Sequence, residues 1–320
     1  MTRVLFVLLC LTISAAASAA TADPYPVRPV RLIVPFAPGG PVDALARILA
    51  PQLHAAFGQS VVVDNRPGAS GLIGIESGIR ATPDGYTITM VSSSYGASAA
   101  TLKLPYHPVN DVAPIVLLNT APQLAVVHPS VPIKTVPELI AYAKANPGKL
   151  NYGSSGTGGS VHLSTEFLSL MAGIRMTHVP YKGQGPALND IMAGQIHLML
   201  GSPTVIYTHV KAGRLRGLAM SGGKRSPAMP DIPTFLETVP GYETYSWQAL
   251  LGPKALPKHL IMRWNTEINR ILQTPEMKAR AAADGVNIEG GGPERFFNIL
   301  KSDLAKWAKV VASGNVKTGG

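Results

Sequence analysis

Cysteine is almost missing from this chain of 320 residues. Cys10 is the only one, and it lies in an apolar stretch at the N-terminus. The rest of the chain contains no cysteine, so it can form no disulfide bond and has no thiolate nucleophile or cysteine ligand for a metal. Aromatic residues make up 6% and charged residues 14% of the chain, whereas the usual charged fraction is about 25%. Much of the surface must therefore be Ser, Thr, Gly, Asn and Gln.

Acidic residues are scarce as well. The chain has 18 Asp and Glu against 28 Lys and Arg, which gives a net charge of +10. The longest basic run is Lys224-Arg225, so the positive charge is spread along the chain. An even spread indicates solubility and a mild attraction for anions rather than a nucleic-acid surface. We therefore expect no nucleic-acid partner.

Long hydrophobic runs are missing except at the N-terminus. Arg3 precedes an apolar stretch over residues 4–13, and the small residues Ala17-Ser18-Ala19 follow it. A membrane anchor needs about 18 or more apolar residues, so the pattern predicts a cleavable export signal over residues 1–19. A second candidate cleavage site is Ala20-Thr21-Ala22. Export and the lack of cysteine favour the bacterial periplasm.

Two segments of the chain share one order of parts. Each segment runs strand, Gly-rich loop, helix, strand, turn, helix, strand, polar loop. The first covers residues 31–94 and the second covers residues 150–203. The 46% of hydrophobic residues and the length allow two folded domains, and the repeated pattern predicts two α/β lobes. The alternative is coincidence, since alternation of strands and helices is common.

Two apolar runs, at residues 115–127 and 215–220, are candidates for connections between the lobes. Two crossings would make the first lobe discontinuous and place a hinge between the lobes. Three expected helices near the C-terminus, at about 257–273, 275–284 and 293–312, would then return to the first lobe. The predicted organisation is lobe 1 at 24–120 plus 222–320, and lobe 2 at 121–221.

The Gly-rich loops at residues 36–40 and 153–159 predict anion sites. A loop between a strand and a helix exposes backbone N–H groups, and the helix dipole adds partial positive charge there. Two such loops across a cleft could hold both ends of a dianion, or one acid group and a polar tail. A charge-assisted hydrogen bond contributes about 1.5–3 kcal/mol. Three to five of them would therefore supply the binding free energy of a ligand with a micromolar Kd, which is about 8 kcal/mol.

Rival motifs do not fit these loops. A Walker A loop would need a lysine where Gly159 stands. Neither loop contains the G-x-G-x-x-G dinucleotide fingerprint or the G-x-S-x-G nucleophile elbow. The sequence has no H-E-x-x-H motif and no carboxylate cluster that would indicate a metal. We therefore expect no cofactor and no metal.

Three groups of polar residues have two interpretations each. Ser155 and His162 could form a nucleophile pair, but His162 lies near a helix N-terminus, where the dipole disfavours imidazolium, so a lining role is favoured. Asp43, in the first turn of the expected helix, could compensate the helix dipole or orient a loop or a water at a ligand. The residues Ser92, Ser93 and Ser94 follow a strand end, where α/β clefts bind ligands, or form a plain loop.

The combination of short motifs along the chain resembles one family. These motifs are Tyr25-Pro26 with Arg28-Pro29, Val34-Pro35-Phe36 with Pro38-Gly39-Gly40 and Asp43, Asn65-Arg66-Pro67-Gly68-Ala69, Pro83-Asp84-Gly85-Tyr86, Leu104-Pro105-Tyr106, Pro147-Gly148-Lys149-Leu150-Asn151-Tyr152, His178-Val179-Pro180-Tyr181-Lys182-Gly183 and Lys306-Trp307-Ala308-Lys309-Val310. They are similar to those of the periplasmic solute-binding proteins of tripartite tricarboxylate transporters, the Bug or TctC-like family. The resemblance covers nearly the whole chain after the predicted signal.

The resemblance implies a two-lobed Venus-flytrap fold of the type II periplasmic-binding-protein class. It also implies that backbone N–H groups and ordered waters capture a carboxylate, that the protein is a monomer and not an enzyme, and that permease subunits in the membrane are its partners. The implied ligand-binding residues are Phe36, Ala37, Gly39, Gly40, Asp43, Ser92, Ser93, Ser94, Ser154, Ser155, Gly156, Thr157, Gly158, Gly159, Ser160, His162, Tyr181, Gln184 and Ser202.

The chain departs from the family pattern at Leu200-Gly201-Ser202, where many relatives carry Asp or Asn. Without that side-chain acceptor, we expect a ligand that lacks an ammonium group: a di- or tricarboxylate, or an aromatic acid. Two other functions share some of these features. One is a sensor subunit for a membrane signalling system, and the other is an exported hydrolase that uses Ser155 and His162.

Overall fold

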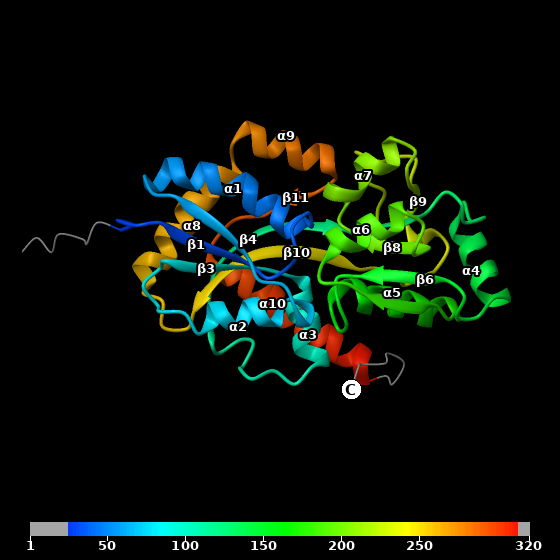
Figure 1. Ribbon diagram of the computed structural model, residues 1–320, viewed down its shortest axis with the longest axis horizontal. Helices are drawn as coiled ribbons and strands as arrows, with labels where there is room; N and C mark the ends of the chain where they lie inside the picture. Colours follow the sequence, from blue (N-terminus) through cyan, green and yellow to red (C-terminus); the bar gives the residue numbers. More distant parts are fainter. Residues whose placement is uncertain (1–24, 313–320) are drawn as a thin grey trace, which may run out of the picture.

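The computed structural model describes residues 25–312, and the predicted signal peptide, residues 1–19, lies outside that range. The chain forms two α/β lobes, each built on one β-sheet with helices on both faces (Figure 1). The first sheet has the strand order β11-β4-β10-β3-β1-β2, and the second has the order β7-β6-β8-β5-β9. The predicted two-lobed α/β fold is therefore confirmed.

The strands are short and mostly buried. The first sheet consists of β1 (Val30–Val34), β2 (Val61–Asn65), β3 (Thr87–Ser92), β4 (Val112–Pro122), β10 (Tyr245–Pro253) and β11 (Asn287–Ile288). The second sheet consists of β5 (Leu124–Val127), β6 (Asn151–Ser154), β7 (Thr177–Pro180), β8 (Leu198–Gly201) and β9 (Arg216–Met220). In the first sheet β1 pairs in parallel with β2 and β3, and in the second β6 pairs in parallel with β7 and β8. Parallel strands end at the same edge of a sheet, so the helices that follow them begin at that edge.

Helices cover both faces of each sheet. The first lobe contains α1 (Pro41–Phe57), α2 (Leu72–Ile79), α3 (Ser93–Thr101), α8 (Lys258–Leu272), α9 (Pro275–Asp284) and α10 (Pro293–Ala312). The second lobe contains α4 (Val136–Ala145), α5 (Ser160–Ala172), α6 (Gln184–Met192) and α7 (Pro203–Lys211). Two short 3-10 helices span Ala69–Gly71 and Phe235–Glu237. None of the helices within residues 25–312 is long and apolar enough to cross a membrane.

The first helix shows how the local sequence sets an element. Pro41 stands at its first position, where the missing N–H costs nothing. Leu45, Leu49 and Leu53 recur at helical spacing and are buried against the first sheet together with Trp264 of α8. Gly58 then takes a left-handed conformation with φ 69°, which ends the helix. These were the features that predicted the helix from the sequence.

The two lobes are joined at two neighbouring crossings. After β4 the chain passes through Gln123 directly into β5, and after β9 it returns to β10 through residues 221–244. The hydroxyl of Ser221 accepts a hydrogen bond from the Gln123 N–H at 2.8 Å and donates one to the Thr244 carbonyl at 2.6 Å. The two crossings are thereby tied together at one point between the sheets.

The predicted boundary between residues 221 and 222 does not match the packing. Phe235, Val239 and Tyr242 are buried in the core of the second lobe, against α5 and the second sheet. The apolar side chains of this return segment find their contacts there before the chain crosses at Thr244. We therefore propose that the second lobe runs from 123 to 243, which moves its end beyond the predicted residue 221.

The last helix, α10, contacts both lobes. Phe296 and Leu300 pack against the first sheet, as expected for a segment that returns to the first lobe. Trp307, further along α10, packs against Ala97 of α3 and Leu163 of α5. Figure 1 shows α10 running below the first sheet toward the second lobe. The helix thus joins the lobes on the side opposite α1 and α9.

Candidate functional site

A cavity lies between the lobes, where five helices begin. Its lining comes from the starts of α1, α3, α5, α6 and α7 and from β10. The lining residues are Phe36, Gly40, Pro41, Val42, Ser92, Ser93, Ser94, Ser155, Ser160, Gln184, Ser202, Ser246, Trp247 and Gln248. Within the described part of the chain, no residue that lines this cavity carries a charge.

The helix starts leave backbone N–H groups available. The N-caps of α1, α5 and α6 are Gly40, Gly159 and Gly183, which have no side chain to cap the first turn. The N-cap of α7 is Ser202, whose side chain makes no capping hydrogen bond. The first N–H groups of a helix have no partner within the helix, so these four starts bring donors and partial positive charge to the cavity. Two of these N–H groups already have side-chain partners: Ser160 donates to the Ser94 hydroxyl and Ser202 to Gln184 Oε1.

The run Ser92–Ser94 is not a plain loop. Ser92 ends β3 and caps α3, because its hydroxyl accepts the Ser94 N–H at 3.4 Å. Ser93 is 1% exposed, lines the cavity, and its hydroxyl has no hydrogen-bond partner among residues 25–312. A buried hydroxyl without a partner is costly. It therefore marks a place where a polar group of a ligand can bind.

The predicted site residues divide into two groups. Those that line the cavity are Phe36, Gly40, Ser92, Ser93, Ser94, Ser155, Ser160, Gln184 and Ser202. Those outside its lining are Ala37, Gly39, Asp43, Ser154, Gly156, Thr157, Gly158, Gly159, His162 and Tyr181. Sequence reasoning missed Ser246, Trp247 and Gln248, since β10 carries no Gly-rich motif and reaches the cavity only by pairing with β3 and β4.

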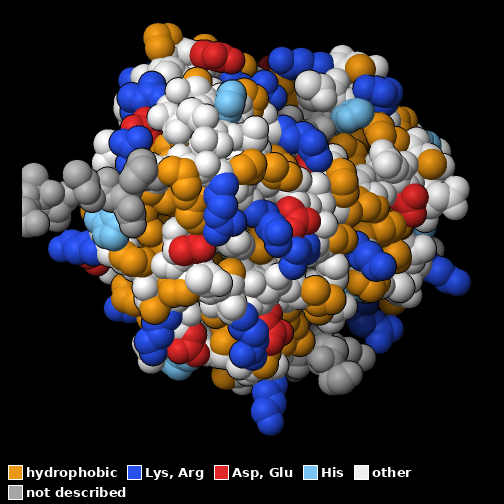
Figure 2. All heavy atoms as spheres, turned by 60° about the vertical axis from the view of Figure 1, so that its left-hand side comes forward, with side chains coloured by type: hydrophobic (Ala, Val, Ile, Leu, Met, Phe, Trp, Pro, Cys, Tyr) orange, Lys and Arg blue, Asp and Glu red, His pale blue; other side chains and the backbone are white. Residues whose placement is uncertain are grey.

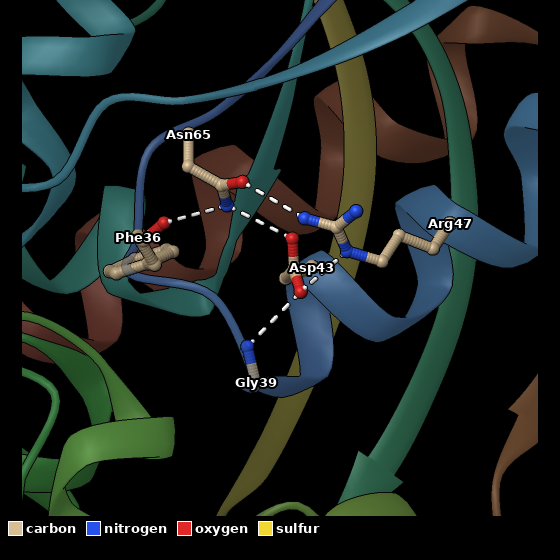
Figure 3. A network of polar contacts seen from close by, with 5 residues as sticks. All are labelled: Phe36, Gly39, Asp43, Arg47 and Asn65. Carbon is tan, nitrogen blue, oxygen red and sulfur yellow. Dashed lines mark hydrogen bonds and ion pairs between the residues drawn. The ribbon is translucent and has the colours of Figure 1, made fainter.

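Asp43 holds the first Gly-rich loop in place (Figure 3). It is 4% exposed. One carboxylate oxygen accepts the Gly39 N–H and Arg47 Nε at 3.0 Å each, and the other accepts Asn65 Nδ2 at 3.0 Å. Asn65 also donates to the Phe36 carbonyl at 3.0 Å. Of the two interpretations of Asp43, the geometry favours orientation of the loop, with Gly39 held at φ 84°.

The pKa of Asp43 follows from these contacts. Burial by itself raises the pKa of a carboxyl group. The hydrogen bonds from Arg47, Gly39 and Asn65 outweigh that effect, and the pKa of Asp43 is lowered. The carboxylate is therefore ionised at neutral pH and fully committed to the protein.

Two histidines support the second Gly-rich loop. His178 Nε2 and the Ser154 hydroxyl lie 2.6 Å apart, and His162 Nδ1 accepts the Gly158 N–H at 3.1 Å. The two imidazoles stack with their centroids 4.0 Å apart. Burial lowers the pKa of His162 to about 4. Burial, followed by repulsion from His162, lowers the pKa of His178 to about 3.

These contacts do not form the machinery of a hydrolase. His162 uses Nδ1 for the Gly158 N–H, and no hydrogen bond joins it to Ser155 within residues 25–312. The close Ser–His pair is instead Ser154 with His178, and Ser154 is fully buried at 0% exposure. A substrate cannot reach a hydroxyl in that position, so the pair positions the loop.

The buried histidines predict an acid-dependent loss of stability. The unfolded chain takes up a proton on each histidine near pH 6.5, whereas the folded chain resists protonation of His162 until about pH 4. The free energy of unfolding should therefore fall as the pH drops from about 6.5 to 4, and His162 should contribute at most about 3 kcal/mol of this fall. Urea unfolding of H162Q at pH 7, 5.5 and 4.5 should show a flatter dependence than the wild type.

The control for this experiment is H54Q, which changes an exposed histidine at the end of α1. Its pH dependence should match that of the wild type. Equal slopes for H162Q and the wild type would show that His162 is not kept neutral by the fold.

The lobes touch each other beside the cavity. The Ala37 N–H donates to the Lys182 carbonyl at 2.9 Å, and the Ser160 N–H donates to the Ser94 hydroxyl at 3.3 Å. The Ser70 hydroxyl donates to the Thr157 carbonyl. Gly185 of α6 lies directly against the loop at residues 38–40, where a Cβ atom would be 2.5 Å from the Pro38 carbonyl oxygen. The arrangement is that of a closed two-lobed clamp.

Comparison with known proteins gives a consistent result over most of the chain. A model of the family described as "Tripartite tricarboxylate transporter family receptor" matches residues 45–316. The "UPF0065 protein in tcbD-tcbE intergenic region" of Pseudomonas sp. (strain P51) is 36% identical over 292 residues, which are 90% of this chain and 87% of that protein. BugT of Bordetella pertussis is 34% identical over 323 residues, which are 99% of each chain.

Solved structures agree in fold as well. An R. palustris protein solved with adipate has a TM-score of 0.88 at 34% identity, and the match covers 91% of this chain and 99% of that one. MatC from Rhodopseudomonas palustris, with bound malate, has a TM-score of 0.86 at 28% identity, covering 90% and 100%. Since the family model and these relatives span most of its length, the chain belongs to the family of tripartite tricarboxylate transporter receptors, which are solute-binding proteins.

Proposed function

We propose that this protein captures a small organic acid in the periplasm and presents the closed complex to the membrane permease of a tripartite transporter. The observation that carries the proposal is the uncharged cavity at which five helices begin. Backbone N–H groups and helix dipoles there favour an anion without a lysine or arginine. A ligand that contacts both lobes stabilises the closed state through contacts that the open state lacks.

The proposed ligand carries a carboxylate and no ammonium group. The cavity lining contains no acidic residue within the described part of the chain, and Ser202, which directly follows β8, has a neutral side chain. The nearby Asp43 carboxylate already accepts hydrogen bonds from Gly39, Arg47 and Asn65. The relatives solved with adipate and with malate support the carboxylate class, because both ligands are carboxylic acids.

The partners and location that we propose follow from the family and the sequence. A receptor of a tripartite transporter works with permease subunits in the membrane, and the export signal predicted at residues 1–19 would place it in the periplasm. We also propose a monomer that is not an enzyme, because the family it belongs to is one of solute-binding receptors. On the face shown in Figure 2, Lys and Arg side chains are scattered among Asp and Glu, which fits the lack of a nucleic-acid partner.

The test is a binding measurement on the mature protein, unfolded and refolded beforehand to remove bound ligand. Thermal unfolding is recorded with citrate, tartrate, malate, glutarate, terephthalate, nicotinate, aspartate and glutamate. A ligand at 100 times its Kd adds about 2.7 kcal/mol to the free energy of unfolding, so a binding acid should raise Tm by several degrees. A Tm that no carboxylate changes would contradict the proposal. Tight binding of aspartate or glutamate in calorimetry would contradict the exclusion of ammonium.

Ser93 offers a sharper test of the site. We take the acid that raises Tm in that panel and expect S93A to lower its affinity about 10-fold. The reason is that a hydrogen bond to a charged group contributes roughly 1.5–3 kcal/mol. The matched control is S98A on the same helix. Ser98 also has a buried hydroxyl without a partner among residues 25–312, but it lies outside the cavity lining. Calorimetry that shows equal affinities for S93A and S98A would remove Ser93 from the site.

A further inference from the structure

A second compartment adjoins the cavity between the lobes. This compartment shares Pro41, Ser202, Ser246 and Gln248 with the first. It extends between α1, β4, α8, α9 and β11 of the first lobe and the start of α7 in the second. Figure 1 shows α9 above the first sheet, next to α7. The second compartment therefore lies directly beside the helix starts.

The wall of the second compartment is mainly hydrocarbon. It includes Leu45, Ile48, Leu118, Leu272, Met277 and Ile288. Covering such a wall with apolar surface of a ligand is favourable, because both surfaces leave water.

Ser246 and Gln248, two of the three polar side chains that both compartments share, already have partners. Asn119 Nδ2 donates to Gln248 Oε1 at 3.3 Å, and the Ser246 hydroxyl donates to the Ala121 carbonyl at 3.1 Å. A hydrocarbon that passes these groups therefore removes no hydrogen bond between them. At the rim, Arg280 lies 4.0 Å from Asp284, so this pair adds little net charge.

We propose that the ligand is an amphipathic acid, with its carboxylate at the helix starts and a hydrocarbon body in the second compartment. This inference rests on the proposed function and names the substrate class of the same site. Compact hydroxy acids would use only the first compartment. An acid with a hydrocarbon body would use both, and each buried methylene would tighten binding about fourfold.

Calorimetry with succinate, butanoate, hexanoate and octanoate tests the proposal on the refolded mature protein. We expect affinity to rise along the three monocarboxylates, by at least about 30-fold between butanoate and octanoate. Equal affinities along the series would overturn the inference, while binding of succinate or butanoate would leave the proposed function standing. A lack of binding by all four acids and by the wider panel would contradict the proposed function itself.

A variant that fills the second compartment tests whether the hydrocarbon part of the ligand binds there. Ala281 on α9 lines the second compartment and is half-buried, so A281W should occupy it. We expect A281W to weaken octanoate at least about 10-fold and to leave butanoate within about twofold. The matched control is A283W, two residues along the same helix at an exposed position, which should bind both acids as the wild type does. If A281W does not fold, T204W fills the compartment from α7 of the other lobe. Equal losses for the long and the short acid in the folded variant would overturn the inference.

Discussion

Replacing Gly185 with alanine should weaken ligand binding by at least about 30-fold and leave the free protein folded. The added Cβ would lie 2.5 Å from the Pro38 carbonyl oxygen and 3.1 Å from the Gly40 nitrogen. Both atoms belong to the backbone of the other lobe, so no side chain can move aside. This clash would keep the lobes from closing fully, and the ligand would then lose its contacts with one of them. A loss of about 2 kcal/mol of binding free energy corresponds to the expected 30-fold change.

The same substitution should not reduce the stability of the second lobe itself. Gly185 is the second residue of α6, and alanine favours a helix over glycine by up to about 1 kcal/mol. Thermal unfolding without ligand should therefore show a Tm equal to or above that of the wild type. Small-angle scattering at saturating ligand should show contraction of the wild type but not of G185A.

The control is G292A, because a Cβ at Gly292 meets no atom within 4 Å. It makes the same chemical change outside the contact between the lobes, and it should bind ligand as the wild type does. Equal affinities of G185A and the wild type would show that the ligand does not need this contact, and would contradict closure as the source of affinity.

Replacing Asp43 should damage both stability and binding. In D43A the Gly39 N–H and the Asn65 amide lose their acceptor in a buried place, which costs roughly 2–4 kcal/mol of folding free energy. In D43N the new amide keeps one oxygen, but its NH₂ group meets donors from Arg47, Gly39 or Asn65. The loop at residues 36–40 then loses its fixed position. We expect ligand affinity to fall at least about 10-fold in both variants.

The pH dependence of Asp43 gives a second measure of its role. Because the pKa of Asp43 is lowered in the folded protein, its contribution is present above the ordinary value of 3.8 and is lost as the pH falls below it. D43N should lack this part of the acid-induced loss in urea unfolding. The control is E76Q, which removes a more exposed pair with Arg80 at the same i,i+4 spacing and should cost less than about 1 kcal/mol. If D43N and E76Q had equal effects, Asp43 would be no more than a surface ion-pair partner.

Much of the architecture was predictable because it is local. The buried strand β1, the proline at the first position of α1 and the glycine that ends it follow one another within a short stretch of chain. The same holds for β6 and α5 in the second lobe. The glycines of these loops also predicted the donors at the helix starts. Each of these features depends on a few consecutive residues, so the sequence shows them directly.

The site could be predicted only in part. Ser93 follows a strand end, and that rule placed it at the cavity. Ser202 also lines the cavity, but it was expected there from the family resemblance alone. Asp43 and His162 were expected at the ligand, but they act one layer behind it, because the loops use their side chains as acceptors. Trp247 was missed, since its strand β10 is brought beside β3 by a pairing between residues more than 150 positions apart.

The sequence by itself determined the two α/β lobes, the Gly-rich helix starts and the lack of charge in the loops, because these depend on local periodicity and residue type. Only the tertiary structure decided where the chain crosses between the lobes, that Gly185 touches the other lobe, and that an apolar compartment adjoins the cavity. These features arise from contacts between segments far apart in the chain, such as α9 with α7 and β10 with β3. Those segments are brought together by the packing of the two sheets, which no local sequence pattern shows.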